Sequence, residues 1–456
     1  MSQVKNNLTL FVLVSAFVFI LAACGGTTAP TSAPPTSAPS TQPTAAPSQA
    51  TSAPSANAGA CADIAQNQSV TMWSPLTGPD GKFMTALADR FSAENGMGVK
   101  VTHLPQPEYM AKLQAAAAAK NLPEMSIIHY ENLAELVIRG VAKPWTDEVK
   151  AQIGDVQADF PAELWAAGDY NGQRYLLPLD VHPLVLYYNK DMFKAAGLPE
   201  PGTKPMTKAE FEKAIETLNK NGVAGISIGT AFQTSAWFQA LIRQFGGAMA
   251  NADGTQATFN SDAGVQALEY LADLKKKYSP GPSGAGDPEV KVFQQGKAAM
   301  VIHGPWHITD MEKLGFVGYA PMPQIGDKYA VWGGSHEMVL TTDDKAKAAA
   351  AGCWMSWLSK NSLEWAKAGQ VPIRKSVREN PQLKTDAAPI AAVADSAASV
   401  SVWPKVPGIV GALWGEGSEQ AINAILLGQK TDIKAALDEA AAKSDKIIAD
   451  NAQKYQ

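Results

Sequence analysis

From residue 69 onward, short apolar runs alternate with longer segments in which apolar residues recur every three or four positions. Residues 69–75 (SVTMWSP) read as a strand, and Phe83, Leu87 and Phe91 then lie on one face of a helix predicted over 81–94. Such alternation, with nearly continuous apolar strands, is typical of a parallel sheet buried under helices on both faces. Further extended segments are predicted at 99–105, 124–130, 223–229, 298–303, 317–323 and 337–342, and further helices at 108–120, 131–140, 207–221, 234–245, 261–278, 288–296, 344–360, 417–427 and 431–450.

The segment 174–193 (RYLLPLDVHPLVLYYNKDMF) interrupts this alternation. It is extended but contains Pro178 and Pro183, and proline fits poorly in a central strand, so we expect it to run between two sheets. The chain from about residue 63 is too long for one core and should form two lobes. We therefore predict an α/β fold in which each lobe is a mixed, mostly parallel sheet flanked by helices. The first lobe is assigned 63–180 and a return segment 326–375, and the second lobe 181–325 and the C-terminal helices 376–456.

The first residues have the pattern of an export signal. Lys5 is followed by an uncharged apolar run over 8–22, and the sequence from Leu21 to Cys24 (LAAC) resembles a lipobox, in which the cysteine thiol is acylated. A transmembrane anchor is the alternative, because the run is close to spanning length. The small residues directly before Cys24 favour a lipoprotein signal peptide over 1–23. We expect a bacterial protein held outside the cytoplasm at the cell membrane by lipid on Cys24.

Residues 24–62 are rich in Ala, Pro, Ser and Thr and carry no charge. A segment with so little to bury cannot offset its ordering entropy, so we predict a disordered linker kept extended by proline. Of the remaining cysteines, Cys61 lies in this linker and Cys353 in a helical pattern. They could form a disulfide, and the sequence leaves their pairing open.

Composition and motifs exclude several classes of function. The formal net charge of −5 and the pI of about 5.8 argue against nucleic-acid binding. The GISIG sequence at 225–229 matches a hydrolase nucleophile pattern, but Ser227 falls inside an alternating strand rather than on a strained turn. His303 and His307 have the spacing of zinc ligands on a helix, but Gly304 and Pro305 between them interrupt that helix. We therefore expect no catalytic residue, no metal and no cofactor.

Polar and aromatic residues gather where the predicted strands end. Ligands of open α/β sheets bind at the carboxyl ends of strands, so two such lobes would hold a site between them. The alternative is that polar residues begin at strand ends in any protein. The segments concerned are Trp73-Ser74, His103, His129-Tyr130-Glu131, Asp180-Val181-His182, Thr230-Ala231-Phe232-Gln233 and His303-Gly304-Pro305-Trp306.

Five segments, spread in order over most of the body, carry a family resemblance: VTMWSPLTGPDGKFMTALADRFSAENGMGVKV, GQRYLLPLDVHPLVLYYNKDMFKAAGL, FQQGKAAMVIHGPWHI, YAPMPQIG with VWGGSHEMVL, and WMSWLSKNSLEWAKAGQVPIRKSV. They resemble the family 1 extracellular solute-binding proteins, the maltose- and oligosaccharide-binding type that serves ABC importers. The resemblance implies the two-lobed periplasmic-binding-protein fold (type II), with a hinged cleft that closes on a sugar. Aromatic faces stack on the C–H faces of sugars, which suits a chain with eleven Trp and a slightly acidic balance.

The resemblance assigns Trp306, in the GPW turn, as a stacking platform for the sugar. Asp180, His182 and His336 are the expected hydroxyl partners, and Gly334 lets a ligand approach the backbone closely. Trp354, Trp357 and Trp365, which follow helical spacing, and the pair Tyr187-Tyr188 are expected in the core. The full set of candidate ligand-binding residues is Trp73, Tyr130, Glu131, Asp180, His182, Gln233, Trp237, His303, Trp306, Gly334, His336 and Trp403.

These features predict a monomeric receptor that binds a carbohydrate and delivers it to the permease subunits of an ABC importer. The same fold could instead bind another polar solute, such as a glycerol phosphodiester or a polyol. A secreted carbohydrate-active enzyme is a third possibility and would need two carboxylates beside the scissile bond. A sensor or adhesion lipoprotein of the same fold would have no partner permease.

Overall fold

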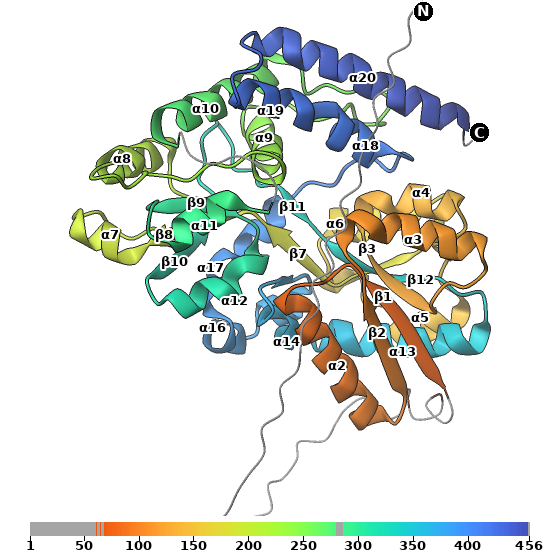
Figure 1. The fold of residues 1–456 in the computed structure, drawn as a ribbon. Coiled ribbons are helices and arrows are strands. Elements are labelled where there is room, and N and C mark those ends of the chain that lie inside the picture. Colours follow the sequence, from red (N-terminus) through yellow and green to blue (C-terminus); the bar gives the residue numbers. More distant parts are fainter. Residues whose placement is uncertain (1–60, 62–63, 65–67, 280–285, 455–456) are drawn as a thin grey trace, which may run out of the picture. The chain divides into compact units, whose positions relative to one another are not determined.

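The computed structural model describes residues 61, 64, 68–279 and 286–454 (Figure 1). The predicted signal peptide, Cys24 and nearly all of the predicted linker lie outside these residues. No helix in the described ranges is long and apolar enough to cross a membrane. Cys61 forms a disulfide with Cys353, with 5.8 Å between their Cα atoms. The bond joins the last part of the predicted linker to helix α13 (Lys345–Lys360).

The first lobe is built on a five-stranded sheet with the strand order β2-β1-β3-β12-β6. β1 pairs in parallel with β2 and β3, whereas β12, which returns from far along the chain, pairs antiparallel with β3 and β6. Both faces are buried: Ile127 packs in the core with α2 and α13, and Ile128 in a second core with α3 and α4. The strands are β1 (Ser69–Ser74), β2 (Gly98–His103), β3 (Met125–His129), β6 (Leu176–Pro178) and β12 (His336–Leu340).

The crossover consists of three consecutive strands that belong to three different sheets. β6 ends at Pro178 in the first sheet, β7 (Asp180–Pro183) lies between β11 (Gly333–Gly334) and β13 (Val371–Pro372), and β8 (Val185–Asn189) enters the second lobe. The two prolines therefore mark the points at which the chain changes sheet, because proline cannot continue a ladder. The middle sheet places His182 opposite Gly334 on β11 and Asp180 opposite Pro372 on β13.

The second lobe has the sheet order β10-β8-β9, with β9 (Met300–His303) and β10 (Val317–Pro321) both antiparallel to β8. This pairing differs from the mostly parallel arrangement expected, because β8 arrives from the crossover and is flanked by strands that run back along it. Residues 223–229, expected as a strand, form isolated bridges instead: Val223 pairs antiparallel with Lys220, and Ala224 and Ser227 pair in parallel with Ala298 and Val301. Short strands β4 (Asp169–Tyr170) and β5 (Gln173–Arg174) form a hairpin in the first lobe.

Most helices agree closely with the periodicity of the sequence. The long helices were predicted within a few residues, whereas several short ones were not predicted because five to seven residues are too few to define a period. In Figure 1 the C-terminal helix α19 lies beside α9 and α10 of the second lobe, α20 packs on α10 and α19, and α18 packs on α20. The other helices are α2 (Pro79–Asn95), α3 (Gln106–Ala118), α4 (Leu133–Ile138), α5 (Asp147–Ile153), α6 (Ala162–Ala167), α7 (Lys190–Ala195), α8 (Lys208–Leu218), α9 (Phe232–Gln244), α10 (Asp262–Tyr278), α11 (Pro288–Gln294), α12 (Ile308–Met311), α14 (Ser362–Ala366), α15 (Lys375–Arg378), α16 (Gln382–Asp386), α17 (Ala388–Val393), α18 (Ile409–Leu413), α19 (Gln420–Leu426) and α20 (Ile433–Lys454).

Candidate functional site

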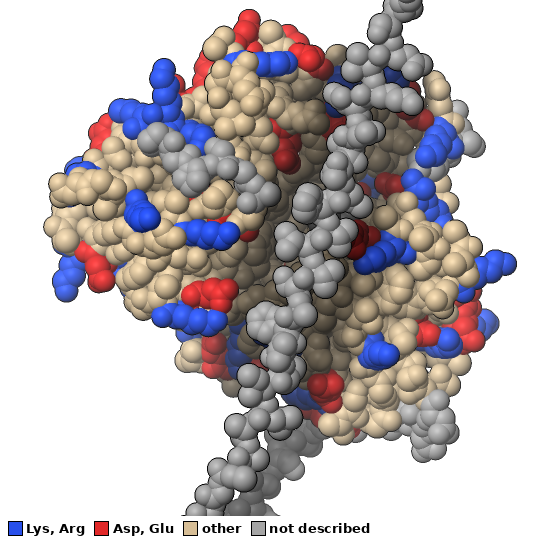
Figure 2. Space-filling model, viewed as in Figure 1, with Lys and Arg blue, Asp and Glu red and all other residues tan. Residues whose placement is uncertain are grey.

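A cavity of about 580 Å³ lies between the two lobes beside the crossover. Its walls come from segments far apart in the sequence, which is the position expected for a ligand site at the ends of two sheets. On the face drawn in Figure 2, basic and acidic side chains are interspersed. The cavity is lined by Pro75, Leu76, Thr77, Gly78, Pro79, Asp80, Gln106, His129, Glu131, His182, Phe232, Trp306, His307, Asp310, Trp332, Gly334, His336, Gln370, Trp403, Val410 and Trp414.

One part of the lining is the aromatic cluster, formed by Phe232, Trp306, Trp332, Trp403 and Trp414. Phe232 is at its centre, with ring centroids 5.5 Å from Trp306, 5.2 Å from Trp332 and 5.4 Å from Trp414. Trp403 is 6.2 Å from Trp414. Aromatic rings at these separations pack favourably on one another and leave apolar surface for the C–H groups of a ligand.

Local backbone features direct two of these rings into the cavity. Trp306 lies in the short turn Pro305–His307 that follows β9, and a Cβ on Gly304 would lie 2.0 Å from the Trp306 ring. A larger residue at position 304 would collide with the ring, so only glycine allows Trp306 to lie here. Phe232 follows Ala231, which has a φ of +66° and so adopts a sparsely populated backbone conformation that costs about 1–3 kcal/mol. The strain at Ala231 accompanies the turn that places Phe232 at the start of α9.

The second part of the lining is the histidine cluster, formed by His129, His182 and His336. The ring centroids are 4.5 Å apart for His182 and His336, 4.9 Å for His129 and His336, and 5.5 Å for His129 and His182. His336 and His129 are register partners on β12 and β3, and His182 on β7 lies opposite Gly334. Strand pairing thus brings three distant parts of the chain to one point.

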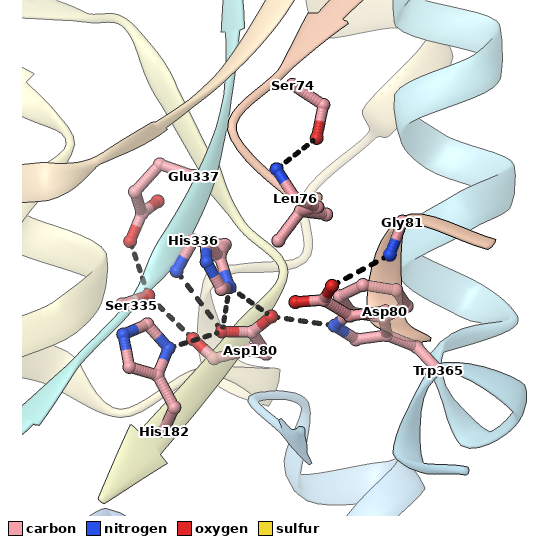
Figure 3. A network of polar contacts seen from close by, with 10 residues as sticks. All are labelled: Ser74, Leu76, Asp80, Gly81, Asp180, His182, Ser335, His336, Glu337 and Trp365. Atoms are coloured by element: carbon pink, nitrogen blue, oxygen red, sulfur yellow. Dashed lines mark hydrogen bonds and ion pairs between the residues drawn. The ribbon is translucent and has the colours of Figure 1, made fainter. Parts of the chain in front are cut away.

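Asp180 contacts two members of the histidine cluster, His182 and His336 (Figure 3). Its carboxylate is 3.2 Å from Nδ1 of His182 and 2.9 Å from Nδ1 of His336, and it accepts a 2.6 Å hydrogen bond from Nε1 of Trp365. The backbone N–H of His336 also donates to it, at 3.1 Å. Asp180 is fully buried, and four donors on one carboxylate satisfy a charge that would otherwise be costly there.

These contacts shift the pKa values of the site. Burial would raise the pKa of Asp180, but His336 and His182 lower it far more, so the net pKa lies below the usual range. Burial lowers the pKa of His182, and lowers the pKa of His129 well below its ordinary value. For His336, burial lowers the pKa, but the carboxyl groups of Asp180, Asp80 and Glu131 together raise it by more, so its net pKa is raised. The buried Asp180 anion thus favours the protonated form of His336, whereas burial favours the neutral forms of His129 and His182.

Two glutamates next to the cluster, the partly buried Glu131 and the fully buried Glu337, have raised pKa values. Burial raises the pKa of Glu131 to about 7 and that of Glu337 to about 8. Glu131 lines the cavity, and its Oε2 is buried without a hydrogen-bond partner in the described structure. Glu337 lies on β12 and accepts a 2.7 Å hydrogen bond from the hydroxyl of Ser335 (Figure 3). A protonated Glu131 can donate a hydrogen bond to a ligand oxygen as well as accept one.

The cavity brings together about half of the candidate residues from the sequence: Glu131, His182, Trp306, Gly334, His336 and Trp403 line it. Tyr130 instead lines a neighbouring cavity of about 350 Å³, together with Trp403 and Arg243. Asp180 lies beneath the surface and contacts the histidines rather than the cavity.

The remaining candidates lie away from the cavity lining. Trp237, 1% exposed, packs in the core of the second lobe, and Trp73 packs against the first-lobe core that includes Tyr109. Gln233 accepts from the backbone N–H of Gly229 and donates to the carbonyl of Ile302, so it connects α9 to β9. His303, also 1% exposed, faces Glu289 and Asp287.

Several lining residues were outside the candidate set. His129 and Phe232 stand at predicted strand ends, and Trp332 directly precedes the Gly-Gly of the WGGSH segment, so each had a signal that could have selected it. Trp414, Gln106 and Gln370 had none, because their segments give no sign of which distant strand ends they approach. Trp354 and Trp365 lie in the core as expected. Trp365 also donates a hydrogen bond to Asp180, which the sequence did not indicate.

Comparison with known proteins identifies the class to which this fold and cavity belong. A family model described as bacterial extracellular solute-binding protein matches residues 86–392, about two-thirds of the chain. The chain belongs to this family, which confirms the resemblance and the two-lobed α/β fold. Members of the family are binding proteins that act outside the cytoplasm.

Individual relatives include proteins for different solutes. The chain is 24% identical over 316 residues to the maltodextrin-binding protein MdxE of Bacillus subtilis, covering 65% of this chain and 72% of that protein. It is 27% identical over 351 residues to the sn-glycerol-3-phosphate-binding periplasmic protein UgpB of Escherichia coli K12, covering 71% and 78%. Among solved structures, the GacH receptor of Streptomyces glaucescens aligns with a TM-score of 0.73 at 22% identity, covering 84% of this chain and 99% of that one. The sugar-binding protein MalE of Xanthomonas citri aligns with a TM-score of 0.72 at 22% identity, covering 85% and 99%.

Proposed function

We propose that this protein is a lipid-anchored receptor of an ABC importer, which captures a sugar in the cavity between its lobes and delivers it to the membrane permease. The observation that carries the proposal is the presence of aromatic faces and hydroxyl-binding groups in one cavity. Trp306 and its neighbours supply the faces, and His182, His336 and Glu131 supply hydrogen-bonding groups. Sugars require both, because each ring has an apolar C–H face and a polar rim.

Closure of the lobes on the sugar would be the signal that the permease reads. In the crossover, β7 pairs only with the two-residue strands β11 and β13, and so short a sheet suits bending at a hinge. Cys24 would carry the lipid that keeps the receptor at the membrane. Replacement of Cys24 by serine is expected to release the protein into the soluble fraction, and retention of that variant in membranes would contradict lipid anchoring.

A glycerol phosphate or a related ester is the second candidate, because UgpB is among the relatives. The lining of the cavity argues against an anionic solute. It includes Asp80, Glu131 and Asp310, and the described residues around it contribute neither Lys nor Arg. Phosphate recognition usually relies on such cations, so a neutral solute rich in hydroxyl groups fits this cavity better.

A thermal-shift screen of the purified protein tests this assignment. The ligands are mono-, di- and oligosaccharides, with glycerol-phosphate esters for comparison. A ligand at a hundredfold excess over its Kd is expected to stabilise the folded protein by about 3 kcal/mol. Trp306→Ala should weaken binding of the selected sugar by about tenfold or more. Trp73→Ala, which removes a tryptophan outside the cavity, should leave the affinity unchanged.

Two results would contradict the assignment. A shift with phosphate esters but none with sugars would favour the second candidate. The second is conversion of the sugar into products during incubation, detected by chromatography. That result would point to an enzyme, since a receptor returns its ligand unchanged.

A further inference from the structure

The histidine cluster has a geometry that the capture of a neutral sugar does not require. One ring nitrogen from each of His129, His182 and His336 lies within 4.8 Å of the others. Imidazoles that share one tetrahedral zinc ion, with Zn–N distances near 2.0–2.1 Å, have ring centres about 5 Å apart. The observed separations of 4.5, 4.9 and 5.5 Å lie on both sides of that value. The backbone has therefore already assembled the spacing of three metal ligands.

Asp180 gives two of these rings the protonation pattern of metal ligands. Nδ1 of His182 and Nδ1 of His336 both face its carboxylate, which can only accept hydrogen bonds. Each neutral ring then carries its proton on Nδ1, and Nε2 keeps a free lone pair. A carboxylate behind a histidine is the usual support for a metal-bound imidazole, because it fixes the tautomer and raises the basicity of the other nitrogen.

The carboxyl groups of Asp80 and Glu131 line the same cavity as the three rings.

A second group of histidines beside the cavity provides an internal comparison. His303 lies 3.5 Å from Asp287 and 3.4 Å from Glu289 through its Nε2 atom, and His307 lies 3.6 Å from Asp287. The backbone N–H of Gly304 donates to Nδ1 of His303 at 2.9 Å, which leaves the proton on Nε2, facing the carboxylates. This group pairs its own charges, whereas in the histidine cluster Asp180 contacts Nδ1 of His182 and of His336, so that Nε2 of each neutral ring keeps its lone pair.

We propose that His129, His182 and His336 bind one divalent transition-metal ion of the zinc type in the wall of the cavity, leaving a coordination position for an oxygen of the captured solute. This inference departs from the expectation of no metal drawn from the sequence. Three imidazoles favour zinc, nickel or copper over magnesium or calcium, which prefer oxygen ligands. Three protein ligands with one open position characterise zinc sites that engage a further molecule. Only the role of the open position rests on the proposed function.

Calorimetric titration with Zn²⁺ tests the site. The protein carries no added histidine tag and is first treated with a chelator to remove bound metal. One ion per chain is expected to bind, and Mg²⁺ is not. Loss of a carboxylate behind a ligand weakens zinc sites about 10–100-fold, so His129→Ala, His182→Ala and His336→Ala should each weaken binding by about 100-fold or more. His129→Ala is the most informative variant, because His129 does not contact Asp180 and its loss leaves the buried network intact.

Two matched variants serve as controls. His103→Ala removes an imidazole that contacts Thr85, away from both histidine groups, and His307→Ala removes one from the second group. Both should bind Zn²⁺ as the unchanged protein does. Absence of Zn²⁺ binding, or an equal loss in the control and ligand variants, would overturn the proposal.

Titration of the selected sugar with and without Zn²⁺ separates this inference from the proposed function. Tighter sugar binding in the zinc-loaded protein supports both. Sugar binding by a protein that takes up no Zn²⁺ leaves the proposed function standing and overturns the metal site. Zn²⁺ binding that depends on the three histidines, without binding of any sugar, supports the site and contradicts the proposed function. Sugar binding of equal strength in both forms would overturn the role of the open position.

Discussion

The histidine cluster and the aromatic cluster share one cavity but are held in place in different ways. Each histidine stands on a strand or at its end, at a position set by ladder register, and a buried carboxylate connects two of them to Trp365. The aromatic side chains come from the start of a helix, a turn and loops, and they rest on one another.

This difference indicates which part of the cavity is coupled to folding. A buried ion pair cannot be broken without leaving an uncompensated charge or donor, so changes to the histidine cluster should affect stability. Rings at a cavity surface contribute mainly to contact with a ligand, so changes to the aromatic cluster should affect binding with less effect on stability. Three substitutions test this contrast, in order of decreasing expected effect.

Asp180→Asn should lower the free energy of unfolding by about 3–5 kcal/mol at neutral pH, because it removes the buried charge that two histidines and Trp365 face. The pKa of Asp180 is lowered in the folded state, so this contribution is present above about pH 4 and is lost as the pH falls toward the folded-state pKa. Urea denaturation in the presence of a chelator measures it. Asp310→Asn, at a half-exposed carboxylate paired with Lys313, should cost about 1 kcal/mol or less, and a similar loss for both would contradict the role of Asp180.

Glu337→Gln should change how stability depends on pH. The pKa of Glu337 is raised to about 8 in the folded state, whereas in the unfolded chain it lies near about 4.3. Between these values the folded state holds the extra proton, so stability falls as the pH rises, by about 1 kcal/mol per pH unit. Glutamine has the shape of the protonated glutamate and stays neutral. The variant should therefore lose the contribution of Glu337 to the fall of stability with pH, as measured by urea denaturation between about pH 4.3 and 8. An unchanged slope would show that Glu337 is ionised in the folded protein, and Glu364→Gln, at an exposed carboxylate paired with Lys367, is the control.

Gly304→Ala should weaken sugar binding by about tenfold while changing stability by about 1 kcal/mol or less. The new methyl group would lie 2.0 Å from the Trp306 ring and displace it, whereas the φ of −70° at Gly304 suits alanine. Calorimetric titration and urea denaturation measure the two effects. Gly411→Ala is the matched control, because no atom lies within 4 Å of its added Cβ. A large loss of stability in Gly304→Ala alone would place Trp306 in the folding core rather than in the binding surface.

Much of the fold could be predicted from local patterns. The helix expected over 261–278 is found as Asp262–Tyr278, and the helix expected over 344–360 as Lys345–Lys360. Each pattern reflects a helix that must bury one face, which is a property of neighbouring residues. The GPW turn at Trp306 was selected for the same reason, because a Gly-Pro pair after an apolar strand determines a turn locally.

The sequence by itself therefore determined the order of elements, the two-lobed class and the tryptophan at the strand-to-helix turn. Only the tertiary structure decided that His129 faces His336, that His182 lies beside Gly334, and that Trp414 stacks on Phe232. It also decided that Trp237 belongs to the core and that residues 223–229 form bridges rather than a full strand. Periodicity reports which face of an element is buried, whereas the partner of that face depends on register and packing between segments far apart in the chain.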